Sequence, residues 1–110
     1  MKLPNVARAF VDIAKLSDYC LSSTHADGRH KARVFQSALG ISAEDAGFLR
    51  RAILDAIMKT NAVAGDSDVY GMRYLVDFEL RREDKQARIR TAWIVRRNED
   101  FPRLLTCYVL

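Results

Sequence analysis

Apolar residues recur with helical spacing along the first half of the chain. In residues 13–20 they fall at positions i, i+3, i+6 and i+7, namely Ile13, Leu16, Tyr19 and Cys20. In residues 29–40 one helical face carries Val34, Phe35, Ala38 and Leu39, and Gly40 follows as the expected helix C-cap. The segment between them, residues 22–28, is rich in turn formers and is expected to be a loop.

The clearest predicted helix lies within residues 42–60. Ser42 followed by Asp45 is typical of a capping box, and acidic residues occupy the first turn. A buried stripe at helical spacing follows it, made of Phe48, Leu49, Ala52, Ile53, Ala56 and Ile57.

After residue 68 the period of the pattern changes from helical to two, which predicts strands. Residues 70–80 alternate, with one face formed by Tyr70, Met72, Tyr74, Val76, Phe78 and Leu80. Residues 87–97 alternate again, with Ile89, Thr91, Trp93 and Val95 on one face and Arg88, Arg90, Ala92, Ile94 and Arg96 on the other. Residues 103–110 form the last predicted strand, and residues 7–12 are either a short strand or the approach to a helix.

Helices followed by an antiparallel meander predict an α+β fold. We expect N-terminal helices packed on one face of a small, mainly antiparallel β-sheet formed by the C-terminal half, with the other face partly free. The length of 110 residues, without a repeat or a linker, predicts a single compact domain over residues 1–110.

Composition places the chain among ordinary folded proteins with a basic surface. The net charge is +4, and residues 81–97 hold seven basic side chains against two acidic ones. Such clustering favours a polyanionic partner. No apolar stretch approaches the roughly 18–20 residues of a membrane span, and no signal peptide is recognised. Two cysteines without metal spacing are expected to be reduced and buried. We therefore expect a cytoplasmic protein with no cofactor, metal or membrane partner.

The segment "HADGRHKARVF", residues 25–35, contains both histidines and a cluster of cations. His30 is expected where the loop becomes a helix, so that free N–H groups of the first turn face the space that a phosphate would occupy. Arg29, Lys31 and Arg33 add cationic donors, and Gly28 lets the backbone approach closely. A histidine beside phosphate-binding cations is what RNA cleavage without a metal needs. The alternative is that His30 only begins a surface helix whose outer face is solvated by the cations.

A second candidate surface is the predicted strand that carries Arg88, Arg90 and Arg96 on one face. If that face is uncovered, it would bind a nucleic-acid backbone. The alternative is an ordinary solvated sheet face, with Trp93 in the core. Thr106 could hydrogen-bond a phosphate oxygen, or it could serve only as a β-former.

The segments "KLSDYCL", "GRHKARVF" and "TAWIVRRNEDFPRLLTCYV" together resemble a bacterial family of compact domains of unknown function, over nearly the whole chain. More distantly, the layout and the His-Lys helix start resemble the barnase–EndoU–colicin–RelE class of ribonuclease toxins. That resemblance implies N-terminal helices on a four-stranded antiparallel sheet and catalysis without a metal. It also implies site roles for His30 and Lys31 on the helix, Thr91 as a strand hydroxyl and Thr106 as the hydroxyl on the last strand.

Two functions follow as hypotheses. The first is a metal-independent, toxin-like endoribonuclease that cleaves RNA by 2′-hydroxyl attack. In it His30, Lys31, Thr91 and Thr106 are catalytic, and the RNA is bound by Arg29, Arg33, Arg88, Arg90 and Arg96. A cognate neutralising protein would control it. The second is a non-catalytic module that binds nucleic acid or protein in a toxin–antitoxin or phage-related locus. The apolar terminal strand "RLLTCYVL" is a candidate edge for such pairing, or for a homodimer.

Overall fold

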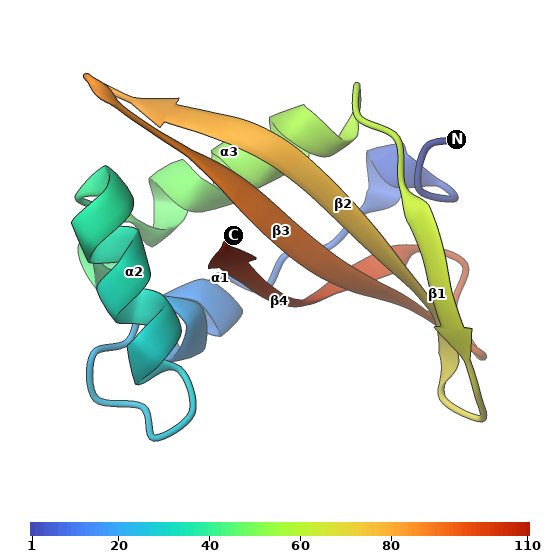
Figure 1. Cartoon of the computed structure of the whole chain (residues 1–110). Helices are drawn as coiled ribbons and strands as arrows, with labels where there is room; N and C mark the ends of the chain where they lie inside the picture. The colour runs from blue at the N-terminus through green and yellow to red at the C-terminus, as the bar shows by residue number, and fades with distance from the viewer.

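The computed structural model describes residues 1–110 and confirms the α+β fold (Figure 1). Three helices precede a four-stranded sheet: α1 (Ile13–Lys15), α2 (Arg29–Leu39) and α3 (Ala46–Ile57). Single helical turns accompany them: η1 (Val6–Arg8), η2 (Leu16–Cys20) and η3 (Ala43–Asp45). The strands are β1 (Val63–Ser67), β2 (Gly71–Arg82), β3 (Lys85–Arg96) and β4 (Pro102–Val109).

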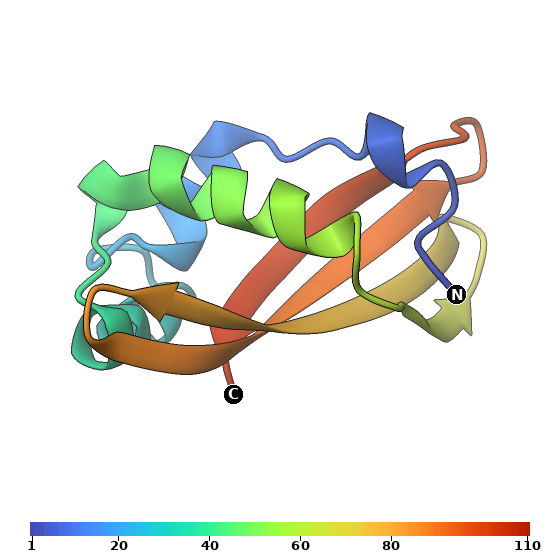
Figure 2. The same ribbon diagram turned by 90° about the horizontal axis from the view of Figure 1, so that it is seen from above.

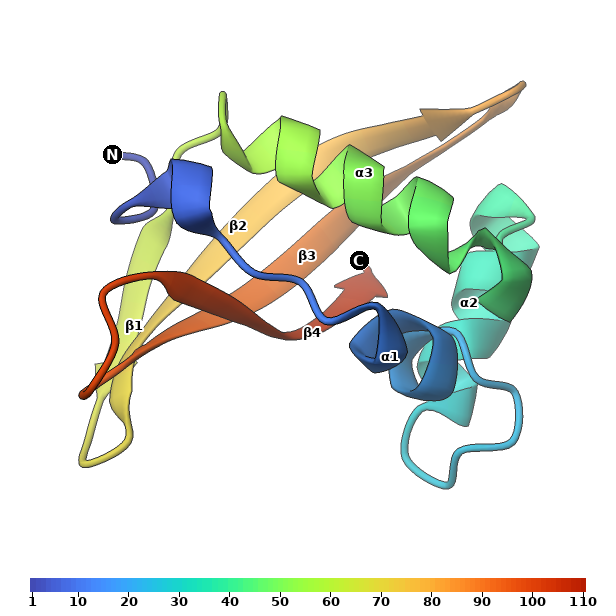
Figure 3. The same cartoon turned by 180° about the vertical axis from the view of Figure 1, so that it is seen from behind.

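The sheet is an antiparallel meander in the order β1-β2-β3-β4. Its two long central strands, β2 and β3, pair along their whole length, with Tyr74 opposite Trp93. Helix α3 and the N-terminal segment lie over one face of the sheet, while α2 stands at one end of it (Figures 2 and 3). The opposite face carries no helix, as expected.

The core lies between α3, the N-terminal turns and the covered face of the sheet. Alternate residues of β2 and β3 point into it, among them Val76, Phe78, Ile89, Thr91 and Trp93. The helices contribute side chains at helical spacing, among them Phe35, Leu39, Leu49, Ile53 and Ile57. Side chains that recur every second residue in the strands and about every 3.6 residues in the helices therefore pack into one apolar cluster.

Both predicted helix ends are confirmed. Gly40 ends α2 with a left-handed backbone, φ 66°, which glycine adopts without the strain of a side chain. Ser42 and Asp45 form the capping box at the start of η3, and α3 continues from it. Arg82 of β2 donates hydrogen bonds to both features, to the carbonyl of Gly40 at 2.9 Å and to Asp45 Oδ1 at 3.0 Å.

Four residues predicted on apolar faces are exposed instead: Ile13, Val34, Phe48 and Tyr70. Helix α2 contacts the core through Ala32, Phe35 and Leu39, so its buried face is turned away from Val34. The ring of Phe48 is partly covered by the guanidinium of Arg82, whose Cζ lies 5.1 Å from the ring centroid. Tyr70 belongs to the turn before β2 rather than to the strand.

Strand β1 was not predicted, because its sequence "VAGDS" lacks an apolar alternation. All five of its residues are exposed, and it forms one edge of the sheet beside β2. Pairing with β2 is interrupted by an irregularity between Ala64 and Ser67.

The last strand, β4, lies at an edge of the sheet, as predicted, but part of that edge is covered. Phe10 pairs with the outer side of β4: its N–H donates to Pro102 O at 2.8 Å, and its carbonyl accepts from Leu104 N at 3.0 Å. Further along β4, the turn η2 lies close enough for Cys20 Sγ to be 3.7 Å from Thr106 Oγ1. At the opposite edge of the sheet, β1 pairs only with β2. None of the helices has the length and apolar character that a membrane crossing demands.

Candidate functional site

A shallow hollow of about 360 Å³ lies where α2 meets the end of β4. The first two turns of α2 bring His30, Lys31 and Val34 to it, and β4 brings Tyr108 and Val109. Val34 is exposed because it lines this hollow rather than the core. His30 and Lys31, predicted from the sequence as a catalytic pair, therefore share one cavity.

Lys31 is held by two tyrosines. Its Nζ donates a hydrogen bond to Tyr19 Oη at 3.1 Å and lies 5.1 Å from the centroid of the same ring. The ring of Tyr108 lies on another side, with its centroid 5.9 Å from Nζ. The hydrogen bond to Tyr19 raises the pKa of Lys31 above its ordinary value, although partial burial opposes the shift. At neutral pH this side chain is therefore a fixed cation and not a base.

Tyr19 is positioned by the loop that precedes α2. The ring of His25 meets the ring of Tyr19 edge-on, with centroids 4.9 Å apart. His25 Nδ1 accepts hydrogen bonds from the N–H groups of Asp27 and Gly28, at 3.0 and 3.1 Å. Gly28 packs on the backbone of Tyr19 so closely that a Cβ would lie 2.0 Å from the Tyr19 carbonyl oxygen. The second histidine, His25, therefore contributes to the site by positioning Tyr19.

Arg90 lies on the open face of β3, opposite Tyr108 of β4. Its Nε and Nη2 donate hydrogen bonds to the two carboxylate oxygens of Asp77 of β2, at 2.9 and 2.8 Å. This fork raises the pKa of Arg90, with a smaller contribution from Tyr108, and lowers the pKa of Asp77. The charge of Arg90 is therefore largely balanced within the sheet.

Thr91, predicted as a catalytic hydroxyl, is completely buried. Its Oγ1 donates to Val76 O at 2.7 Å and accepts from Trp93 Nε1 at 2.8 Å. A hydroxyl with both functions satisfied in the core cannot orient a phosphate at the surface, so the role predicted for Thr91 does not fit this position. The alternation that puts Thr91 on the same face as Trp93 already carried this information.

Thr106 is half-buried and faces the turn η2 rather than the hollow. Beside it, Cys20 and Cys107 are buried free thiols, as expected. The interaction with Cys107 lowers the pKa of Cys20, and the same interaction together with burial raises the pKa of Cys107. Cys20 directly follows Tyr19, and Cys107 directly precedes Tyr108. The two buried cysteines therefore anchor the two tyrosines of the site to the core.

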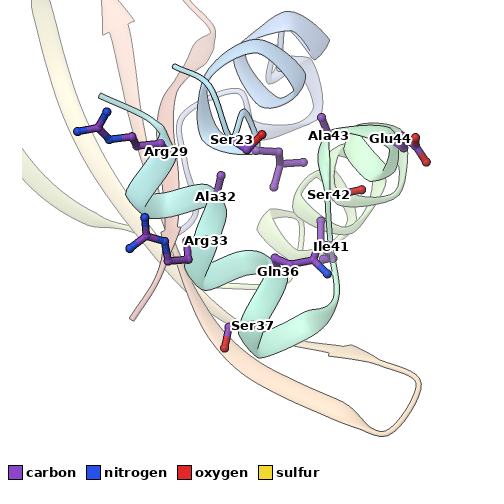
Figure 4. Close-up of a pocket in the computed structure, with 11 residues that line it drawn as sticks. Ser23, Arg29, Ala32, Arg33, Gln36, Ser37, Ile41, Ser42, Ala43 and Glu44 are labelled. Carbon is purple, nitrogen blue, oxygen red and sulfur yellow. The ribbon is translucent and has the colours of Figure 1, made fainter. Parts of the chain in front are cut away.

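The remaining predicted arginines do not form one surface. Arg88 lies 3.9 Å from Glu79 on the neighbouring strand, and Arg96 lies at the opposite end of β3, paired in register with Gly71. Arg29 and Arg33 line a larger pocket on another side of α2 (Figure 4). The predicted groove of arginines along the strand is therefore absent, because acidic side chains of β2 lie beside the arginines of β3.

Tyr19 and Tyr108 were not identified from the sequence as site residues. Each falls in an apolar run, "DYCL" and "TCYV", where a tyrosine is expected to contribute to the core. A signal for Tyr108 was present, since strand alternation places it on the face opposite buried Cys107. No group of three or more His, Cys, Asp or Glu side chains is arranged so that it could hold a metal ion.

The family model described as a domain of unknown function, DUF6883, matches residues 2–110, and the chain belongs to this family. The match confirms the resemblance to a family of compact domains of unknown function. The family match shows no link to ribonuclease toxins, so that resemblance stays a prediction. Comparisons with curated proteins and with solved structures found no match.

Proposed function

For this member of the DUF6883 family we propose the activity of a metal-independent endoribonuclease. The observation that carries the proposal is the meeting of an imidazole, an ammonium group and a phenol in one hollow, from His30, Lys31 and Tyr108. Histidine is the side chain whose protonation changes near neutral pH, and a cation beside it can stabilise the charge that develops on a phosphate.

The reaction proposed is attack of a ribose 2′-oxygen on the adjacent phosphorus. His30 takes the proton of the 2′-hydroxyl, the new O2′–P bond forms, and negative charge builds on the non-bridging oxygens. Lys31 stabilises that charge. The P–O5′ bond then breaks, and the Tyr108 hydroxyl donates its proton to the departing 5′-oxygen. The products are a 2′,3′-cyclic phosphate and a 5′-hydroxyl.

The roles first expected for Thr91 and Thr106 are not part of this proposal. Tyr19 replaces them as a positioning residue, because its hydroxyl accepts the hydrogen bond from Lys31. Arg90 acts through Tyr108 rather than as a free phosphate ligand, because its Nε and Nη2 already donate to Asp77.

The test is incubation of the purified protein with transfer RNA in the presence of EDTA, followed by analysis of the product ends. We expect cleavage that leaves cyclic phosphates, and loss of about 100-fold or more of the rate in His30→Ala, because general acid–base groups typically contribute that much. Lys59→Ala, an exposed lysine beyond the end of α3, is the charge-matched control for Lys31→Ala and should retain full activity. Intact RNA at high protein concentration, or equal cleavage by His30→Ala, would overturn the proposal.

A second candidate function is a non-catalytic, protein-binding module. The observation in its favour is the open edge of β1, whose five residues are all exposed, together with Val69 and Tyr70, which are 80% and 69% exposed. An open strand edge beside apolar side chains suits pairing with a strand of a partner. A neutralising protein or a second copy of the chain would bind there. Mutation of the edge would then abolish binding in a protein that leaves RNA intact.

A further inference from the structure

A cavity of about 640 Å³ lies on another side of α2 from the hollow of His30 and Lys31. It is enclosed by α2 and by the segment 41–44 that leads into α3 (Figure 4). Its volume lies within the range of sites that take small organic ligands, roughly 300–1,000 Å³. Nothing in the cleavage chemistry proposed above uses it.

The cavity combines an apolar floor with a charged rim. Leu21, Ala32 and Ile41 are buried residues that contribute to its lining. Arg29 and Arg33 stand on the α2 side, and Glu44 lies on the opposite side (Figure 4). A flat ring would cover the floor, with its polar groups directed to the rim.

The two arginines differ from most of those on the sheet. Six arginines form ion pairs with carboxylates: Arg8, Arg73, Arg82, Arg88, Arg90 and Arg103. The side chains of Arg29 and Arg33 are exposed, make no hydrogen bond or ion pair, and are one helical turn apart on α2. They are therefore available to an anion from outside the chain.

We propose that this cavity is a nucleotide subsite for the RNA strand whose scissile phosphate occupies the hollow beside His30. The inference rests on the proposed function. The base lies on the apolar floor, and its phosphate is bound at the rim by Arg29 and Arg33. Because an α-helix with its side chains is only about 10–12 Å across, neighbouring nucleotides of one strand pass over the N-terminal turns of α2 to reach both cavities.

Glu44 gives the subsite a preference among bases. A carboxylate accepts hydrogen bonds and donates none, so it favours a base that presents an exocyclic amino group. Cytosine, adenine and guanine have such a group, whereas uracil has none. The subsite therefore selects against uracil.

The first experiment measures binding without cleavage. The probe is a fluorescent 2′-O-methyl oligoribonucleotide, which keeps the phosphates but lacks the attacking hydroxyl. In Arg29→Ala/Arg33→Ala we expect an affinity loss of about 10-fold or more and a fall of about 1.4 in the salt slope, the value for two single-strand phosphate contacts. The control, Arg50→Ala/Arg51→Ala, removes the same charge from exposed positions of α3, away from the cavity. Equal losses in both double variants would overturn the subsite.

The second experiment titrates cytidine and uridine 5′-monophosphates into the ¹⁵N-labelled protein. We expect amide shifts at α2 and residues 41–44, tighter binding of the cytidine nucleotide, and loss of that preference in Glu44→Gln. Absence of shifts at these residues would overturn the proposal, and equal binding of both nucleotides would overturn the role of Glu44. Neither readout needs cleavage, so a protein that binds here but leaves RNA intact would refute the nuclease and not the subsite.

Discussion

Trp93 Nε1 donates a hydrogen bond of 2.8 Å to Thr91 Oγ1, two residues earlier on the same face of β3. Both side chains are completely buried, and Thr91 in turn donates to Val76 O on the neighbouring strand at 2.7 Å. The threonine is therefore the only route by which the indole N–H of the largest core side chain is satisfied.

We expect Thr91→Val to destabilise the protein by about 1–3 kcal/mol, because it leaves the indole N–H buried without an acceptor. Thr91→Ser keeps the hydroxyl and should cost less. The measurement is urea denaturation followed by tryptophan fluorescence. RNA cleavage by the folded fraction of Thr91→Val should equal that of the wild type; a large specific loss at unchanged stability would return Thr91 to the site.

Tyr19→Phe removes the hydroxyl that accepts from Lys31 while keeping the ring beside His25. Because that hydrogen bond is the main cause of the raised pKa, we expect the pKa of Lys31 to fall toward its ordinary value of 10.5. The readout is a pH titration of the labelled lysine side chains by NMR, with Lys59 as an internal reference. An unchanged Lys31 titration would show that the phenol does not hold the amine in solution.

Gly28→Ala tests how tightly the loop packs on η2. The new Cβ would lie 2.0 Å from a backbone oxygen of Tyr19, so the loop must move, at a cost of about 1–3 kcal/mol for overpacking. The control is Gly47→Ala in α3, where nothing lies within 4 Å of the new methyl group. Since alanine favours a helix over glycine, that variant should gain up to about 1 kcal/mol. Thermal unfolding of both proteins distinguishes a specific clash from a general effect of substitution.

The paired hydrogen bonds from Arg90 to Asp77 predict that the free energy of unfolding depends on pH in the acid range. These hydrogen bonds hold the pKa of Asp77 below the ordinary value of 3.8. A lowered native pKa contributes stability above the unfolded pKa, and this contribution is lost as the pH falls through the native pKa. We therefore expect wild type to lose more stability than Asp77→Asn below about pH 4, the region set by the ordinary aspartate pKa. Parallel acid-unfolding curves for the two proteins would contradict a role of the fork in stability.

Local chemistry in the sequence was sufficient to predict the helix ends and the long strands. Gly40 acts through its own backbone, Ser42 and Asp45 bond to each other within one turn, and the alternation over residues 70–80 needs only a covered face. The helix of residues 29–39 was also predictable, but not its exact buried face, which depends on where the sheet end lies.

The candidate site was only half predictable, because it depends on contacts between distant segments. His30 and Lys31 are neighbours in the chain, whereas Tyr19 and Tyr108 reach them from η2 and β4. The charge of the strand face was misjudged for a related reason. Its arginines are balanced by Asp77 and Glu79 only because β2 and β3 pair in one particular register.

The single pair of bonds between Phe10 and β4 also bears on how this chain folds during synthesis. Phe10 has no backbone partner until Pro102 and Leu104 arrive, and Arg8 likewise pairs only with Asp100. Contacts between such distant residues form late, since a long loop must close first. The helices therefore emerge from the ribosome with their apolar faces uncovered, and the protein is most exposed to aggregation in the interval before β4 is released.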